Sequence, residues 1–268
     1  MSQWIIRHGA MRMLGSFDPE QGTYARGDEV VLRTERGHET GTVLCPSTPE
    51  LLAGLIEPTT GRIIRTMTEA DHAHRARLRE TETREMQLCE EFVANRRLQM
   101  EVVDVEHLFG GERIVFYFLA EKRVDFRELV KDLARECQTR IEMRQIGVRD
   151  EAKLLADYGD CGKPVCCNTH MVAMPPVSMR MAKMQKSTLD PSKISGRCGR
   201  LKCCLRFEQD VYEEHAAELP PVGSRVVTSK GQGRVLAHEV LARRLLVEFE
   251  DGRRLPVALA EVLTRLGR

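Results

Sequence analysis

Short runs of alternating apolar and polar residues recur along this chain, and a period of two predicts β-strands. Two such runs, Glu29 to Thr34 and Glu39 to Cys45, flank a turn at residues 35–38 and predict a hairpin near the beginning. Gln99 to Val105 and Arg113 to Leu119 flank a glycine pair suited to a reversing turn. We therefore expect a small β-rich element at the start and a second hairpin in the middle of the chain.

A long helix is predicted between these hairpins. The residues from Thr68 to Leu98 include no glycine or proline, are highly charged and contain a minority of apolar side chains. The favourable pair Glu80 and Arg84 adds only about 0.2 to 0.5 kcal/mol to helix stability. Packing against another element must therefore supply the rest.

The second hairpin is expected to continue into a helix and a further strand. Apolar residues fall at helical positions 0, 3, 4, 7, 8 and 11, which are Phe126, Leu129, Val130, Leu133, Ala134 and Cys137. We expect Asp125 to cap this helix, with Glu128 three positions later completing a capping box. Arg140 to Val148 alternates again and predicts a strand. The order of this unit is β-β-α-β.

The C-terminal part is predicted to form a small SH3-like β barrel. A charged helix is expected at Glu208 to Glu218, and the prolines and glycine of residues 220–223 indicate a linker. Four short strands are expected after this linker, at Arg225–Thr228, Gly233–His238, Arg244–Glu250 and Arg253–Val257.

The predicted fold is therefore α+β, in five parts. They are an N-terminal β-rich element (1–66), a long helix (67–98), the β-β-α-β unit (99–150), a region of cysteine-rich loops (151–218) and the small barrel (219–268).

The composition of the chain excludes several classes of protein. The chain has 268 residues, 42% of them apolar, and a net charge of +1, which argues against a strongly basic protein that wraps nucleic acid. No apolar run approaches the roughly 18 residues of a membrane span, and no signal peptide is evident, so we expect a cytoplasmic protein without a membrane span. The sequence contains no nucleotide-binding, hydrolase or zinc-protease motif. We expect a protein that is not an enzyme.

Six of the nine cysteines occur in two copies of one phrase. Cys161-Gly-Lys-Pro-Val-Cys166-Cys167 is followed 37 residues later by Cys198-Gly-Arg-Leu-Lys-Cys203-Cys204. In a reducing compartment such thiols favour metal binding over disulfides. All six cysteines are therefore candidate ligands of a metal or an iron-sulfur cluster.

Spacing alone leaves three arrangements open. Each phrase offers three thiols, whereas zinc and iron-sulfur sites usually take four protein ligands. Adjacent cysteines on a helix point about 100° apart, so both rarely reach one zinc ion. One site can use Cys161, Cys198 and one cysteine of each adjacent pair; two three-cysteine sites can be completed by another chain; or the thiols can act as a redox switch. Neither phrase has the usual spacing of a zinc knuckle or a ferredoxin.

The second phrase has strongly basic surroundings. Lys193, Arg197, Arg200, Lys202 and Arg206 lie around it, and no acidic residue occurs between Asp190 and Glu208. Such charge can offset an anionic cluster or contact a phosphate backbone, or it can simply be solvated. Aromatic residues for base stacking are scarce nearby, so direct RNA binding is weakly supported.

Other candidate ligands are weaker. His170 follows the first phrase and is expected to be a surface residue rather than a ligand. Cys45, Cys89 and Cys137 have apolar neighbours and are expected to be small buried hydrophobes. The methionine-rich run Met171 to Pro191 is expected to supply adaptable packing and is a candidate contact surface.

Several motifs in order resemble the bacterial RicT (YaaT) family, from about Gly27 to Tyr212. They are Arg123-Val-Asp-Phe-Arg-Glu-Leu-Val130, Arg140-Ile-Glu-Met-Arg-Gln-Ile-Gly-Val-Arg149, Met181-Ala-Lys-Met-Gln185, Lys193-Ile-Ser-Gly196 and Cys198-Gly-Arg-Leu-Lys-Cys-Cys-Leu205. All six cysteines stand at the family's cysteine positions. The first phrase departs from the family, because Tyr158-Gly-Asp160 replaces the usual glycines and isoleucine and Asn168-Thr-His170 follows the pair, so its cluster environment is expected to differ.

The resemblance implies a regulatory subunit without enzymatic activity. It would join two helical partner subunits of the RicA and RicF type in a complex that carries [4Fe-4S] clusters and directs the endoribonuclease RNase Y in mRNA maturation. Family members are also linked to sporulation, competence and biofilm development. Two alternatives stay open on the residues alone: a zinc-stabilised nucleic-acid-binding protein and a dithiol redox enzyme.

Overall fold

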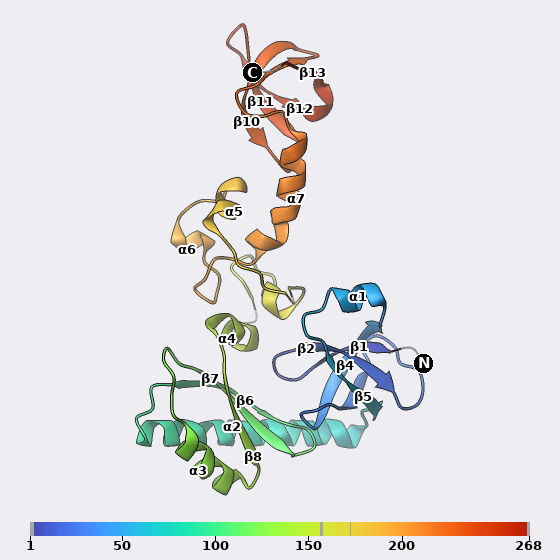
Figure 1. Ribbon diagram of the computed structural model, residues 1–268, viewed down its shortest axis with the longest axis vertical. Helices are drawn as coiled ribbons and strands as arrows, with labels where there is room; N and C mark the ends of the chain where they lie inside the picture. The colour runs from blue at the N-terminus through green and yellow to red at the C-terminus, as the bar shows by residue number, and fades with distance from the viewer. Residues whose placement is uncertain (1–2, 156–157, 172, 267–268) are drawn as a thin grey trace. The chain divides into compact units, whose positions relative to one another are not determined.

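The computed structural model describes residues 3–155, 158–171 and 173–266, and it confirms the α+β class (Figure 1). The chain divides into two compact units, Met1–Ala173 and Met174–Arg268. The five predicted domain limits stay predictions, and each unit is described by itself.

The first unit begins with a closed five-stranded barrel, where the sequence had indicated a smaller β element. The strands are β1 (Trp4–His8), β2 (Met13–Pro19), β3 (Glu29–Arg33), β4 (His38–Pro46) and β5 (Thr59–Thr66), in the order β1-β2-β5-β3-β4. Strands β3 and β4 form the predicted antiparallel hairpin, and β2 pairs with β5 in parallel. The short helix α1 (Pro49–Ala53) connects β4 to β5. Ile6, Phe17, Val30, Leu32, Val43 and Ile63 fill the interior.

Glycine at position 61 allows close packing in this barrel. A Cβ atom added there would meet the carbonyl oxygen of Arg33 and would lie 3.0 Å from the Phe17 ring. We therefore expect Gly61→Ala to lower the free energy of unfolding by about 1–3 kcal/mol. The matched control is Gly54→Ala, where the nearest atom would be 3.5 Å away. Urea titrations followed by the fluorescence of Trp4, the only tryptophan, measure both variants. Equal stabilities would contradict the expectation.

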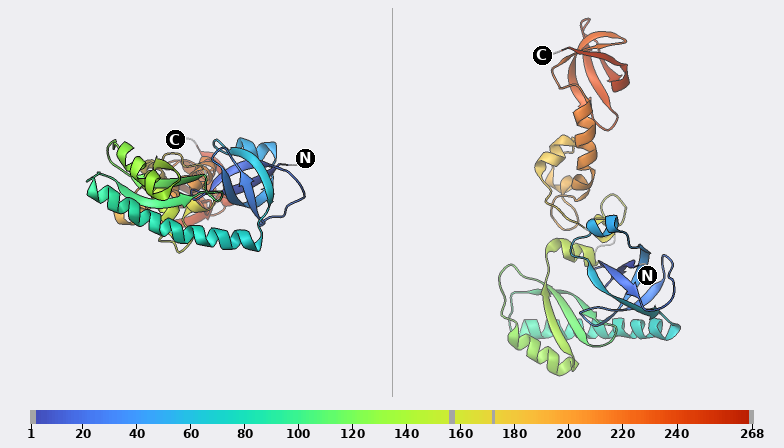
Figure 2. Two further views of the ribbon diagram at one scale, coloured as in Figure 1. Left: turned by 90° about the horizontal axis from the view of Figure 1, so that it is seen from below. Right: turned by 45° about the vertical axis from the view of Figure 1, so that its right-hand side comes forward.

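The predicted long helix is α2 (Glu69–Asn95), which lies along both the barrel and the neighbouring sheet of the first unit (Figures 1 and 2). Thr68 caps it: its hydroxyl accepts a hydrogen bond from the N–H of Asp71, and the Asp71 carboxylate accepts one from the N–H of Thr68. Cys89 and Val93 are buried against the sheet. Packing of these few apolar residues against the sheet therefore stabilises a helix whose other side chains are mostly charged.

The β-β-α-β unit is confirmed. It consists of β6 (Glu101–His107), β7 (Arg113–Leu119), α3 (Arg127–Cys137) and β8 (Arg140–Gln145), with strand order β6-β7-β8 and β8 parallel to β7. Strand β7 is buried on both faces. Ile114 and Phe116 pack with α2 and α3, whereas Val115 and Tyr117 pack with a second cluster that includes Met11 and Leu108. Helix α4 (Val148–Leu155) follows.

The predicted capping box of α3 is wrong. The N-cap position is Phe126, which has no side-chain capping bond, and Glu128 pairs with Lys131 instead. Asp125 lies one residue earlier, where its carboxylate accepts a hydrogen bond from the N–H of Arg127 at 3.2 Å. The apolar face was predicted correctly, since Leu129 and Leu133 are fully buried.

The second unit contains three helices and a five-stranded sheet among its described residues. The helices are α5 (Met179–Met184), α6 (Pro191–Ile194) and α7 (Cys204–Glu218), so α7 begins four residues before the predicted start at Glu208. The strands are β9 (Arg225–Thr228), β10 (Gly231–Glu239), β11 (Arg244–Phe249), β12 (Arg254–Ala258) and β13 (Val262–Leu266), in the order β12-β11-β10-β9-β13. The first four match the predicted strands. The SH3-like closure of this sheet stays a prediction.

Candidate functional site

The first cysteine phrase folds into a tight turn, which we call the first knuckle (residues 158–169). Tyr158 and Pro164 form a β-bridge. The N–H of Gly159 donates to the carbonyl of Lys163 at 2.9 Å, and the N–H of Gly162 donates to the carbonyl of Gly159 at 3.0 Å. Gly162 has a φ of 73°, in the left-handed region that glycine adopts readily, which explains the glycine after the leading cysteine.

The second phrase folds in the same way, 37 residues later, and forms the second knuckle (residues 195–206). Ser195 and Leu201 form the bridge. The N–H of Gly196 donates to the carbonyl of Arg200 at 2.8 Å, and that of Gly199 donates to the carbonyl of Gly196 at 2.9 Å. Gly199 has a φ of 69°. The repeated phrase is therefore a repeat of backbone structure as well as of sequence.

Both knuckles place their adjacent cysteines at the start of a helical turn. In the first, the N–H of Thr169 donates to the carbonyl of Cys166, within the short 3₁₀ helix Cys166–Asn168. In the second, the N–H of Arg206 donates to the carbonyl of Cys203, and the turn continues as helix α7. The two cysteines of a pair therefore project in different directions, as expected for neighbours on a helix.

The six thiols are accessible to different degrees. Cys161 is exposed, and Cys166, Cys167, Cys198, Cys203 and Cys204 are half-buried. Among the residues that the structure describes, no three histidine, cysteine or acidic side chains are grouped so as to hold a metal ion. The three thiols of one knuckle are thus not gathered around a common point. The first knuckle belongs to the first unit and the second to the second unit, so their convergence on one site stays a prediction.

The surroundings of the second knuckle combine positive charge with partial burial. Lys193, Arg197 and Arg200 are exposed, and Arg206 pairs with Asp210 at 2.7 Å. Burial raises the pKa of the Cys204 thiol, and the neighbouring Cys203 acts in the same direction. A raised pKa disfavours the reactive thiolate that a redox enzyme needs, and it means that a metal must displace a proton to bind there.

Side chains outside the phrase fix the second knuckle. Gln185, from the methionine-rich run, donates to the carbonyl of Leu205 and to Gln209 at 3.1 Å. Gln209 is only 4% exposed, and its amide also donates to Glu213 at 2.9 Å. The N–H of Lys202 donates to the carbonyl of Ile194, which is buried. The family-like motifs around Gln185 and Ile194 therefore hold the knuckle in place.

The remaining candidates behave mostly as predicted. His170 is exposed and contacts the hydroxyl of Thr169. Cys89 is fully buried and Cys137 packs against the same core, whereas Cys45 is only half-buried. Burial raises the pKa of Cys89 to about 12 and that of Cys137 to about 11. These two thiols are structural.

This difference predicts the pattern of thiol alkylation. In native protein treated with a chelator, iodoacetamide is expected to modify the exposed Cys161 and to leave Cys89 and Cys137 unmodified, because burial suppresses both access and thiolate formation. Mass spectrometry of tryptic peptides measures the modification, and urea-unfolded protein is the control in which all three react. Equal rates at Cys89 and Cys161 in native protein would contradict this assignment.

Sequence reasoning missed a buried polar network in the first unit. His8, which is 2% exposed, contacts Glu39 at 3.1 Å, and Thr34 donates to the same carboxylate at 2.6 Å. Arg36 pairs with both Glu39 and Glu106. Glu106 also accepts hydrogen bonds from the hydroxyl of Tyr117 at 2.6 Å and the N–H of Ala10 at 2.9 Å. The network joins the barrel to the sheet across positions far apart in sequence, and no local pattern signals it.

The sequence of this chain is similar to those of known proteins. The chain is 41% identical over 233 residues to the stage 0 sporulation protein YaaT of Bacillus subtilis (strain 168), and the match covers 87% of this chain and 84% of that protein. An uncharacterized protein of Schizosaccharomyces pombe is 42% identical over 62 residues, which is 23% of this chain and 8% of that protein.

Two conserved regions also match. The PSP1 C-terminal conserved region matches residues 61–146, and the third domain of PSP1-like proteins matches residues 176–219, which include the second knuckle. No solved structure matches the chain. Within the described part of the chain, no helix has the length and apolar character needed to cross a bilayer.

Proposed function

Because this chain belongs to the RicT (YaaT) family, we propose that it is a non-enzymatic regulatory adaptor subunit of an iron-sulfur-containing complex that directs RNase Y-type mRNA processing. The observation that carries this proposal is the repeated knuckle, which presents two matched sets of three cysteines on the same backbone scaffold. A scaffold of this kind, repeated within one chain, is suited to thiolate coordination.

The donor set fits a [4Fe-4S] cluster. Cys161 and Cys198 each begin a cysteine phrase and stand alone, whereas Cys166 with Cys167 and Cys203 with Cys204 are adjacent pairs whose members project in different directions. If the two knuckles share one site, one cysteine from each pair together with Cys161 and Cys198 would supply the four thiolates that such a cluster takes. A bound cluster would add redox and oxygen sensitivity to the site, while the basic residues of the second knuckle would offset its negative charge.

The proposed partners follow from the family. Helical subunits of the RicA and RicF type would complete the complex, and RNase Y would be its client. The printed name of the Bacillus subtilis relative refers to sporulation, and we extend a regulatory role of that kind to this chain. Competence and biofilm development are further processes that the family likeness suggests. We propose a cytoplasmic location for the complex.

One observation favours a second candidate function. Three exposed basic residues lie in or just before the second knuckle: Lys193, Arg197 and Arg200. The sheet of the second unit follows the knuckle along the chain. A zinc ion held by the same thiols, with this charge facing a phosphate backbone, would give a zinc-stabilised nucleic-acid-binding protein.

An anaerobic pull-down tests the proposed function. Affinity-tagged wild-type chain, expressed in its own host, is expected to co-purify proteins of the RicA and RicF type, identified by mass spectrometry, together with iron and sulfide. The matched bait is the Cys198→Ser variant, which is expected to lose the iron. If the bait carries stoichiometric zinc, no iron and neither partner, the adaptor proposal is wrong and the zinc alternative takes its place.

A further inference from the structure

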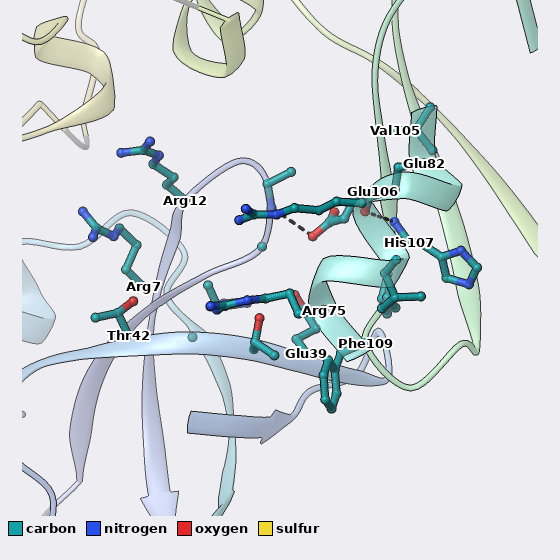
Figure 3. A pocket seen from close by; sticks show the side chains of 18 of the residues that line it. Arg7, Arg12, Glu39, Thr42, Arg75, Glu82, Val105, Glu106, His107 and Phe109 are labelled. Carbon is teal, nitrogen blue, oxygen red and sulfur yellow. Dashed lines mark hydrogen bonds and ion pairs between the residues drawn. The ribbon is translucent and has the colours of Figure 1, made fainter. Parts of the chain in front are cut away.

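A polar cavity of about 500 Å³ lies within the first unit, where the barrel, helix α2 and strand β6 meet (Figure 3). The barrel contributes Arg7, and the loop after β1 contributes Arg12; α2 contributes Arg75, Arg79 and Glu82, and β6 contributes Asp104 and Glu106. The volume is in the range of known small-molecule sites. None of the six knuckle cysteines lines it, so its role is separate from that of the proposed cluster site.

Contacts between the surrounding elements hold this cavity in shape. Glu106 of β6 pairs with Arg36 and accepts the N–H of Ala10 at 2.9 Å. Arg75 of α2 donates to Glu29 of β3 at 2.7 Å. A third contact joins β6 to α2, where the N–H of His107 donates to Glu82 at 2.9 Å. A cavity with walls tied together in this way needs little reorganisation to accept a ligand.

Four arginines from three segments face this space. In Figure 3 the Arg75 side chain extends from α2 toward the barrel, and Arg7 and Arg12 lie on the barrel side of the cavity. Arg75 is engaged by Glu29. Within the described ranges, the side chains of Arg7 and Arg79 make no hydrogen bond or ion pair. Unengaged guanidinium groups of this kind are suited to bidentate contacts with phosphate.

The acidic residues of the lining are mostly committed to other groups. Glu29 pairs with Arg75, both Glu39 and Glu106 pair with Arg36, and Glu82 accepts the N–H of His107. Burial raises the pKa of both Glu82 and Asp104. The cavity therefore offers a ligand the guanidinium groups of Arg7 and Arg79, together with the carboxyl oxygens of Glu82 and Asp104 as hydrogen-bond acceptors.

We propose that this cavity binds a phosphate-bearing nucleotide, either free in solution or as part of an RNA chain. Arg7 and Arg79 would contact phosphate oxygens, and Glu82 and Asp104 would accept hydrogen bonds from ribose hydroxyl or base amino groups. The cavity would give the protein a binding site for a nucleotide or for RNA that does not involve its cysteines.

Isothermal titration calorimetry on the full chain tests this proposal with three probes: pyrophosphate, ADP and a short single-stranded RNA. The Arg7→Gln/Arg79→Gln double variant is expected to bind whichever probe the wild-type protein binds at least about tenfold more weakly than the wild type does. The matched control is Arg33→Gln/Arg77→Gln, which removes the same charge from exposed positions of the barrel and of α2 that do not line the cavity. Trp4 fluorescence in urea titrations verifies that both variants are folded.

The probes distinguish the two sources of phosphate. If ADP or pyrophosphate binds and competes with RNA, the natural ligand is a free nucleotide. If only RNA binds, and its affinity depends less steeply on salt in the double variant, the cavity binds the phosphates of an RNA backbone. The proposal is overturned if none of the probes binds wild-type protein at millimolar concentration, or if the control variant loses as much affinity as the cavity variant. Iron content is expected to be unchanged in both variants, so this outcome is separate from that of the cluster proposal.

Discussion

Replacing Cys198 with serine is expected to remove essentially all iron from anaerobically purified protein. Cys198 is the only cysteine at the head of its knuckle, so no neighbour can replace it, and a serine hydroxyl is a poor ligand for iron in a cluster. The substitution changes one atom, and the hydrogen bonds of the turn are made by its backbone. Loss of iron would therefore reflect a lost ligand rather than a lost fold. Iron analysis and visible absorption measure the result.

The parallel variant Cys161→Ser distinguishes the arrangements that the sequence leaves open. If the two knuckles share one cluster, each substitution alone removes all of the iron. If each knuckle forms a separate site with a partner chain, each substitution removes about half of the iron. Cys45→Ser is the control, because Cys45 lies outside both knuckles and is expected to keep the full iron content. Full iron content in both knuckle variants would contradict a role for the leading cysteines.

Replacing Arg36 with alanine is expected to give the largest loss of stability, about 3–5 kcal/mol at neutral pH. Arg36 lies between two buried carboxylates, Glu39 and Glu106, and pairs with both. Burial acts to raise the pKa of Glu39, but hydrogen bonds and the charges of His8 and Arg36 outweigh it and lower that pKa. Without Arg36, two buried negative charges lose their main cationic partner.

The sign of the pH dependence follows from this arrangement. A carboxylate whose pKa is lowered in the folded protein stabilises it above the unfolded pKa, and this contribution is lost as the pH falls through the folded value. The stability difference between Arg36→Ala and wild type is therefore expected to shrink in acid, where the carboxylates of the variant take up protons. Urea titrations followed by Trp4 fluorescence at several pH values measure it. Arg33→Ala, at an exposed position of the same hairpin, is the control and is expected to cost less than about 0.5 kcal/mol.

Regular local patterns explain which parts of the fold were predictable. The β3–β4 hairpin and the apolar face of α3 have strong periodicity, and the segment of the long helix is highly charged and free of glycine and proline; all three came out as expected. The rest of the barrel did not. Strand β5 contains Gly61 together with polar and charged residues, and it pairs in parallel with β2, a contact between segments more than 40 residues apart. Long-range pairing of this kind leaves no signature in a local window.

The start positions of α3 and α7 were predicted wrongly because local sequence signals do not fix where the backbone enters a helix. Asp125 and Glu128 have the spacing of a capping box, but the backbone enters the helix one residue later, so Asp125 bonds Arg127 from outside the cap position. Helix α7 begins within the second knuckle because the turn around Cys203 continues into it, whereas the sequence signals only the charged part from Glu208.

For the candidate site, the sequence predicted six cysteines as ligands, and that assignment stays a prediction, but it did not predict the backbone scaffold that carries them. The glycines after Cys161 and Cys198 were visible as a repeated feature, and the structure gives their reason in a positive φ at each position. The Arg36 network and the arginine-lined cavity were invisible, because their members come from the barrel, α2 and the sheet. Only the packing of these elements brings together charges that are widely spaced in the sequence.

Metal and sulfide analysis of the anaerobically purified complex tests whether the knuckle cysteines hold an iron-sulfur cluster. We expect a brown protein in which iron and acid-labile sulfide are present in nearly equal amounts, both lost when Cys198 is replaced by serine. A colourless protein that holds stoichiometric zinc, or one whose iron is unaffected by replacing Cys161 and Cys198, would contradict it.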